Sequence, residues 1–355
     1  MFVKDNIEFH NAAELVPCMH PNGVALYRYP TEVVAHLTTL GHHAAACSDG
    51  VELRFVSGDD WISLTLSARS NYQFSPGATV RVYRGDMLFA TYQIPDGATQ
   101  TIKLMSPPQY AALAPEVFNE VMYGPQLWRI VCSGATVIYH GIDTAGQAIR
   151  PPSVSEKPRL RWLGYGSSIS NHEPGYLRHA SRYLGVDLYN KGLCGACFCE
   201  KEAADYLAGE DWDFATLELG VNMRGSVSSA EFEERAYNFV ETFRRIAPGK
   251  PIILLTIFPN GDDYYREPTR CSTANAEFRE ILRRLHGESG DADLYLLEGN
   301  KILTRLDDLS PDLIHPHEEA RQRMGRNLAD LLRPILAQYF TLPAPSGLQW
   351  AFSVA

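Results

Sequence analysis

The 355-residue chain has no cluster of lysine and arginine and no long apolar run. Its 32 Lys and Arg stand against 42 Asp and Glu, which gives a formal net charge of −10. Nucleic-acid binding needs a basic surface that displaces counterions from phosphates, so this balance argues against such a partner. The longest apolar stretch, PIILLTIFP at 251–259, has the length of a strand and is bounded by prolines. We therefore expect neither a membrane span nor a membrane partner.

The sequence also lacks the even number of regularly spaced cysteines that is typical of a disulfide-bonded protein. The seven cysteines are an odd number without regular spacing, so at least one thiol must be free. The first residues, MFVKDNIEFHNAAELV, carry charges where a signal peptide would have its apolar segment. We expect a cytoplasmic protein with reduced thiols.

The first part of the chain is a succession of short β-like runs. Between about residues 50 and 143, apolar and polar residues alternate in stretches such as VELRFVSGDD and WISLTLSA, with turn residues between them. Two such runs break at Gly85-Asp86 and at Ser133-Gly134. Short alternating strands of this kind predict an antiparallel sandwich of jelly-roll type. We assign it to residues 1–155, which end in the linker GQAIRPPSVSEKPRL.

The second part of the chain alternates between strands and helices. The runs LRWLGYG, VDLYNKG, FATLELG, PIILLTIF and DLYLLEG are mostly apolar, as in a parallel sheet that is buried on both faces. A helix that begins after Ser228 carries Glu231 at the capping-box position and an apolar stripe, and it ends before Pro248-Gly249. This pattern predicts a three-layer α/β domain of flavodoxin type over residues 156–345.

Polar residues follow several of the predicted strands, at the sheet edge where α/β folds hold their ligands. Ser168 follows the first strand, and Asp312 and His315 precede the last helix. A serine becomes a nucleophile only when a base removes its proton. We assign Ser168 as nucleophile, His315 as base and Asp312 as the residue that orients the base. The oxyanion would be bound by the backbone N–H groups of Ser168 and Gly195 and by the side-chain amide of Asn222.

These residues lie in four blocks, GSSI, NKGLCG, LGVN and DLIHP, which in this order resemble the SGNH (GDSL-type) hydrolases over roughly residues 158–340. The resemblance implies a flavodoxin-like fold, ester hydrolysis through an acyl-enzyme, and no cofactor. Ser167 stands where the family usually has Asp. An all-β domain ahead of an SGNH domain is similar to two-domain carbohydrate esterases that remove acetyl groups from plant polysaccharides.

Each residue also has a simpler interpretation. Ser168 alone would be a helix cap, and Asp312 could begin a turn, which would leave a Ser-His dyad. His172 and Glu173 stay undecided between substrate contact and an exposed turn. We interpret the cysteines at 194, 197 and 199 as packing residues and expect no metal, since no second ligand pair follows. The candidate walls of the substrate pocket are Tyr165, Met223, Arg224, Tyr264 and Tyr265.

The sequence therefore predicts a serine esterase that acts on small O-acyl esters, above all O-acetylated sugars. One alternative is a lipid or thioester acyl hydrolase, although the chain has no long apolar lid. An alternative from another class is a non-catalytic carbohydrate-binding protein, against which the complete set Ser168, His315 and Asp312 argues. The oligomeric state stays open, a homo-oligomer included.

Overall fold

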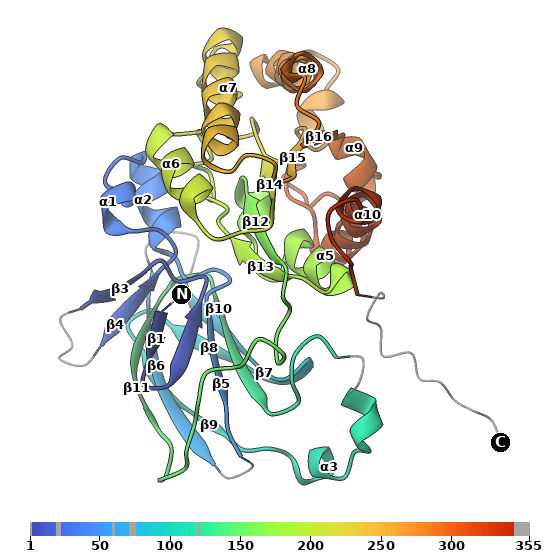
Figure 1. The fold of residues 1–355 in the computed structure, drawn as a ribbon. Coiled ribbons are helices and arrows are strands. Elements are labelled where there is room, and N and C mark those ends of the chain that lie inside the picture. The colour runs from blue at the N-terminus through green and yellow to red at the C-terminus, as the bar shows by residue number, and fades with distance from the viewer. Residues whose placement is uncertain (1, 19–22, 59–60, 71–75, 119–120, 344–355) are drawn as a thin grey trace.

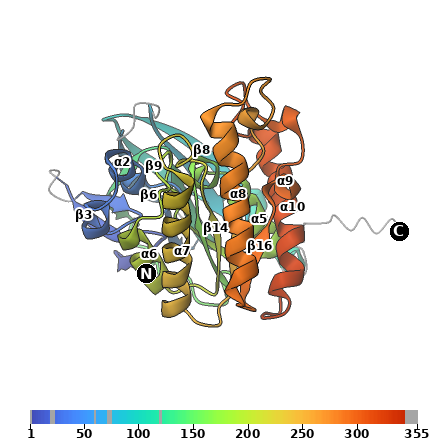
Figure 2. The same cartoon turned by 90° about the horizontal axis from the view of Figure 1, so that it is seen from above.

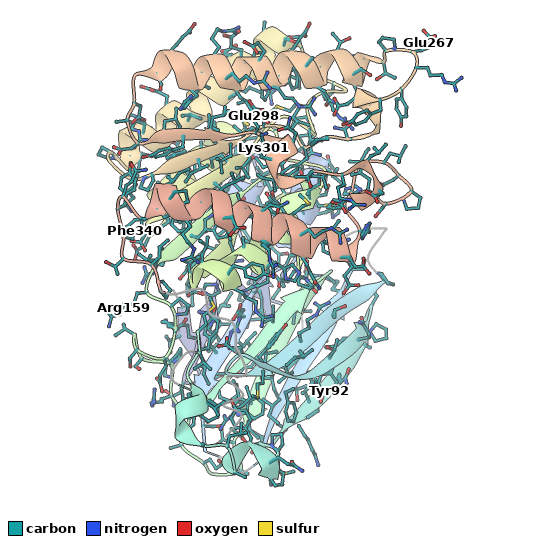
Figure 3. The ribbon with its side chains drawn as sticks, turned by 90° about the vertical axis from the view of Figure 1, so that its right-hand side faces the viewer. Tyr92, Arg159, Glu267, Glu298, Lys301 and Phe340 are labelled. Atoms are coloured by element: carbon teal, nitrogen blue, oxygen red, sulfur yellow. The ribbon has the colours of Figure 1, made fainter. Side chains whose placement is uncertain are left out.

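The computed structural model of the chain describes residues 2–18, 23–58, 61–70, 76–118 and 121–343. It has two bodies, an all-β body from the first part of the chain and an α/β body from the second (Figure 1). Seen from the side, Tyr92 lies on the β body and Glu298 on the α/β body (Figure 3). None of the helices in the described ranges is both long enough and apolar enough for a membrane span.

The β body is an antiparallel sandwich, as predicted. One sheet has the strand order β1-β2-β5-β10-β7-β8 and the other β3-β4-β11-β6-β9. Apolar side chains from both sheets form one core. The strands of the first sheet are β1 (Phe2–Lys4), β2 (Ile7–His10), β5 (Glu52–Val56), β10 (Leu127–Ser133), β7 (Gly77–Arg84) and β8 (Met87–Pro95). Those of the second are β3 (Glu14–Pro17), β4 (Val24–Tyr27), β11 (Thr136–Asp143), β6 (Ile62–Arg69) and β9 (Thr99–Leu104).

The alternating sequence explains why these strands bury one side. Along β7, Val80 and Val82 are fully buried, while the residues between them are partly exposed. Gly85 has φ +58 and forms the turn between β7 and β8, a left-handed conformation that glycine adopts without strain. The break predicted at Gly85-Asp86 is therefore confirmed.

The α/β body contains one parallel five-stranded sheet of order β13-β12-β14-β15-β16. This is the flavodoxin-like order, with the first strand of the body between the second and the third. The predicted fold class is thus confirmed. The strands are β12 (Arg161–Tyr165), β13 (Asp187–Asn190), β14 (Phe214–Glu218), β15 (Ile252–Leu255) and β16 (Leu294–Leu297).

Helices cover both faces of this sheet. One apolar cluster joins it to α6, α7 and α8, and another joins it to α5 and α10. Figure 2 shows α7 and α8 side by side across one face. The predicted cap of α7 is present, since the Ser228 hydroxyl accepts from the Glu231 N–H at 3.2 Å. The helices are α4 (Ser168–Asn171), α5 (Tyr176–Leu184), α6 (Lys201–Gly209), α7 (Ser229–Ile246), α8 (Arg270–Ser289), α9 (Gly299–Ile302) and α10 (Glu318–Leu336), with 3-10 turns at Gly261–Asp263 and Leu306–Asp308.

A helical segment of the β body packs into the core of the α/β body. Helices α1 (Thr31–Val34) and α2 (Thr39–Ala46) lie beside α6 (Figure 1). In the described part of the β body, the other helical elements are α3 (Pro108–Ala111) and a 3-10 turn at Pro115–Phe118. Buried apolar side chains of residues 29–45 belong to the same cluster as the sheet and α6 to α8. This segment of the β body therefore shares a core with the α/β body, while the sandwich has a core of its own.

Polar contacts continue this interface along β13, the edge strand of the parallel sheet. The buried Arg54 guanidinium binds both carboxylate oxygens of Asp187 at 2.7 and 2.8 Å. His10 Nε2 donates to the carbonyl of Leu188 at 2.8 Å. The β body thus occupies the edge of the sheet that would otherwise be open.

Candidate active site

Ser168 lies directly after β12, at the first position of the short helix α4. The hydroxyl of Ser167 caps this helix by accepting from the Ile169 N–H at 3.2 Å. The strand-to-helix turn is tight: a Cβ on Gly166 would lie 2.4 Å from Ser170 Oγ and 2.6 Å from a carboxylate oxygen of Glu218. Only glycine fits there, and the turn leaves Ser168 partly exposed between buried neighbours.

The structure brings the predicted base and its partner to this serine. Ser168 Oγ lies 2.7 Å from His315 Nε2, and His315 Nδ1 lies 2.7 Å from Asp312 Oδ2. The other Asp312 oxygen accepts from the backbone N–H groups of Ile314 and His315, each at 3.0 Å. Partial burial opposes ionisation, but these hydrogen bonds prevail and lower the pKa of Asp312. Asp312 is thus a carboxylate that fixes the orientation of the imidazole.

A hydrogen bond links the segments that carry two of the predicted oxyanion donors, Gly195 and Asn222. The loop that follows β13, residues 191–197, is called the oxyanion loop below. Gly195 in this loop has φ +68, and Asn222 Oδ1 accepts from the Cys197 N–H at 3.1 Å. That hydrogen bond orients the side-chain oxygen of Asn222 toward the oxyanion loop. It does not use the side-chain nitrogen, which is the predicted oxyanion donor. Ser168, Gly195 and Asn222 are all half-buried, which keeps them accessible to a small ligand.

Glu218, at the end of β14, is a buried carboxyl beneath the serine turn. Its Oε2 accepts from the N–H and the hydroxyl of Ser167, each at 2.7 Å, and from the Ser170 hydroxyl at 3.1 Å. Burial raises the pKa of Glu218 to about 7, against the action of those hydrogen bonds. Sequence reasoning missed this residue, although a charged residue inside the apolar run FATLELG was a signal.

The predicted substrate-contact residues fall into two groups. Tyr165 and Met223 are 1% and 0% exposed and belong to the hydrophobic core. Arg224 is buried and binds Asn260 Oδ1 at 2.7 Å and Asp262 at 3.0 Å. These three side chains pack or form hydrogen bonds inside the protein. The structure therefore does not support their contact with a substrate.

The two tyrosines of the second group lie at the surface. Tyr264 and Tyr265 are 60% and 49% exposed. Their loop contacts the loop that carries His315, since the Gly261 N–H donates to the Leu313 carbonyl at 2.6 Å. Both tyrosines therefore remain candidates for a substrate contact next to His315.

The two undecided residues after the nucleophile differ in their surroundings. His172 is exposed, its backbone N–H donates to the Ser168 carbonyl at 3.2 Å, and its ring contacts Arg321. Glu173 is buried and binds Arg178 at 3.0 Å. Of the two, His172 is the one exposed to solvent, and its backbone bonds to that of Ser168.

Among the described residues, no disulfide involves the cysteines at 194, 197 and 199. Burial raises the pKa of both Cys197 and Cys199, so these groups are held as thiols rather than as metal-binding thiolates. Within the described ranges, no group of three His, Cys, Asp or Glu residues is placed to hold a metal ion.

Residues 163–323 match the GDSL-like Lipase/Acylhydrolase family, and this range includes Ser168, Asn222 and His315. No curated protein is significantly similar to the chain in sequence.

Solved structures show the same fold at low sequence identity. A salicylyl-acyltransferase from a tetracycline biosynthetic pathway is 18% identical with a TM-score of 0.77, covering 93% of this chain and 95% of its own. A GDSL-like lipase described as putative, from Bacteroides ovatus, is 19% identical with a TM-score of 0.64, covering 96% and 100%. A family two carbohydrate esterase from Clostridium thermocellum, in complex with cellohexaose, is 15% identical with a TM-score of 0.60, covering 93% and 99%. The two-body arrangement is thus shared along nearly the whole chain.

Proposed function

Starting from a chain in which residues 163–323 are a GDSL-like lipase/acylhydrolase domain, we propose that the protein is a serine esterase that removes small acyl groups, above all acetyl groups, from carbohydrates. The observation that carries the proposal is the continuous chain of contacts from Ser168 Oγ through His315 to Asp312, with 2.7 Å at each step. Such a chain is the geometry that serine needs for nucleophilic attack.

In the proposed reaction, His315 Nε2 takes the proton of Ser168 as the serine oxygen attacks the ester carbonyl carbon. The negative charge that forms on the carbonyl oxygen is bound by the N–H groups of Ser168 and Gly195 and by the amide of Asn222. The C–O bond to the alcohol then breaks, and His315 gives its proton to the departing oxygen. Water, deprotonated by His315, attacks the acyl-enzyme and releases the carboxylic acid and free Ser168.

Two observations support a sugar as the alcohol. Several solved structures with the same two-body fold are named as carbohydrate esterases, one of them in complex with cellohexaose. The exposed Tyr264 and Tyr265 lie on a loop next to that of His315, and sugar rings stack on aromatic side chains. Within the same proposal, a cytoplasmic location would favour acetylated oligosaccharides over polymers.

The test is hydrolysis of aryl esters from acetate to octanoate, set beside acetylated xylo-oligosaccharides and an acyl-CoA thioester. We expect short acyl chains to be preferred and Ser168→Ala to abolish turnover while the protein stays folded. A fluorophosphonate probe followed by peptide mapping should label Ser168, and a label on Ser167 would overturn the assignment. A preference for long acyl chains or for the thioester would favour the lipid or thioester alternative.

A second outcome of the acyl-enzyme is transfer to an alcohol instead of water. The salicylyl-acyltransferase with the same fold gives a reason to test it. Product analysis in the presence of free sugar or glycerol separates the two reactions, because transfer produces a new ester and hydrolysis produces acid alone.

A further inference from the structure

We propose that Arg28, a residue of the β body, is a positioning residue for the active site, since its guanidinium group ties the nucleophile helix α4 to the oxyanion loop. The inference rests on the proposed function, because it assigns Arg28 a part in aligning Ser168 with the oxyanion donors. It makes the β body a component of the catalytic centre.

The side chain of Arg28 is fully buried, at 0% exposure. Two of its hydrogen bonds stay within the β body: Nε donates to the Cys47 carbonyl at 2.9 Å and Nη2 to the Ala44 carbonyl at 2.6 Å. Both carbonyls lie at the C-terminal end of α2, where the helix dipole is negative. This end of α2 therefore anchors the guanidinium.

The other three hydrogen bonds reach the α/β body. Nη1 donates to the Gly192 carbonyl at 2.8 Å and to the Asn190 carbonyl at 3.2 Å, where the oxyanion loop leaves β13. Nη2 donates to Asn171 Oδ1 at 2.8 Å, at the last residue of α4. With five bonds in all, the five N–H donors of the guanidinium can each find an acceptor.

Asn171 is also held by a second side chain of the β body. Its Nδ2 donates to Asp49 Oδ2 at 3.0 Å, while Asp49 Oδ1 accepts from the Gly134 N–H at 2.7 Å. One end of the amide therefore meets a cation and the other a carboxylate, an arrangement that strengthens both hydrogen bonds. The end of the nucleophile helix is clamped between Arg28 and Asp49.

The oxyanion loop and the nucleophile helix touch at this point. A Cβ on Gly192 would lie 2.6 Å from Asn171 N and 2.7 Å from Asn171 Cα, so the two backbones are in direct contact. Ser168 is three residues from Asn171, and Gly195 is three residues from Gly192. Arg28 thus holds the two segments that carry the nucleophile and an oxyanion donor, a short distance from each.

The choice of arginine supports a positioning role. Among the described residues, no carboxylate forms an ion pair with Arg28, so the buried charge is balanced by carbonyl dipoles alone. A planar fork of five donors can bind carbonyls of three segments at once, whereas a lysine has three donors on one nitrogen. Arg28→Lys keeps the positive charge but cannot bind the carbonyls of all three segments at once. We therefore choose it as the test variant.

Arg84 provides a matched control. It is 2% exposed and also donates to backbone carbonyls, those of Gln126 at 2.8 Å and Ser57 at 3.3 Å, both of which belong to the β body. Arg84→Lys should therefore lower the melting temperature as Arg28→Lys does, without an effect on the active site.

The experiment measures aryl acetate kinetics and hydrogen exchange of the full-length chain. For Arg28→Lys we expect kcat to fall at least about tenfold with KM changed less than about threefold, because misalignment acts on the transition state. Amides of residues 167–172 and 190–197 should exchange faster than in the wild type. Arg84→Lys should show neither effect. Equal kcat and equal exchange in the two variants would overturn the inference.

Two further measurements separate the inference from other failures. If the wild type hydrolyses none of the esters, the proposed function fails, and exchange at residues 167–172 and 190–197 still decides the role of Arg28. If Arg28→Lys does not fold, Asn171→Ala takes its place, since it removes the contact at the other end. A fall in kcat and faster exchange in that variant would support the clamp, and wild-type values of both would refute it.

Discussion

The carboxyl group of Glu218 accepts two hydrogen bonds from Ser167, one from the backbone N–H and one from the hydroxyl, both at 2.7 Å. Since the same hydroxyl caps α4, Glu218 fixes the turn on which Ser168 is mounted. In the described ranges, no lysine or arginine forms an ion pair with this carboxyl, which is buried at 1% exposure. Burial without a countercharge is why the pKa of Glu218 rises to about 7.

Replacing Glu218 by glutamine should change how stability depends on pH. The folded state binds the proton of Glu218 more tightly than the unfolded state, because its pKa is about 7 against an ordinary 4.5. The contribution to the free energy of unfolding is complete at low pH and is lost as the pH rises through about 7. Between pH 5 and pH 8, Glu218→Gln should therefore gain on the order of 1 to 3 kcal/mol relative to wild type.

Urea unfolding at several pH values measures this difference. Glu234, an exposed residue, is the control: its replacement by glutamine makes the same chemical change at the surface. A constant difference for Glu218→Gln would show that the carboxyl titrates as an ordinary glutamate.

Replacing Asn222 by alanine should lower kcat by on the order of a hundredfold, with a smaller effect on KM. The amide is held by the Cys197 N–H at its oxygen end, so its nitrogen is available to the charge that forms in the transition state. Steady-state kinetics on an aryl acetate provide the measurement. Wild-type kcat in this variant would remove Asn222 from the oxyanion site.

The contacts among Ser168, His315 and Asp312 could be predicted from sequence because their signals are local. Ser168 follows an apolar strand by a short turn, and Asp312 lies three residues before His315, so each motif is read within a few positions. The alternation of strands and helices then places both motifs at the same edge of a parallel sheet. The fold could be predicted for the same reason. Alternation of apolar and polar residues indicates the strands of the β body, and the succession of strands and helices indicates the α/β body.

The contacts between the two bodies could not be predicted in this way. Arg28 and Gly192 are 164 positions apart, and Arg54 and Asp187 are 133 apart. No local pattern pairs such residues, since a buried arginine looks like any surface arginine in the sequence. Tyr165 and Met223 are the opposite case. They lie near motif residues in the sequence and are therefore expected to line the substrate pocket, but their side chains pack in the hydrophobic core.

Removing metal ions should leave activity unchanged. The thiols of Cys197 and Cys199 are buried, and burial raises their pKa, which disfavours the thiolate that zinc requires. Incubation with a chelator, followed by assay and elemental analysis, tests this expectation. Stoichiometric zinc that leaves together with activity would reverse the interpretation of these cysteines as packing residues.

Replacing Asp187 by alanine should destabilise the whole protein by about 1 to 3 kcal/mol, because the buried Arg54 guanidinium loses its bidentate partner and keeps the carboxylate of Glu52 at 2.9 Å. The ion pair joins β5 of one body to β13 of the other, and apolar residues 29–45 share the core of the α/β body. We therefore expect both bodies to unfold in one calorimetric transition, in the wild type and in Asp187→Ala alike. Asp205→Ala, which removes a partly exposed carboxylate of α6, is the control and should change stability by less than about 1 kcal/mol. A chain that begins near residue 156 would lack the core residues of α1 and α2 and should not fold alone. Two separate transitions, or a soluble and active truncated chain, would show that the β body is a detachable module and would contradict its place in the catalytic centre.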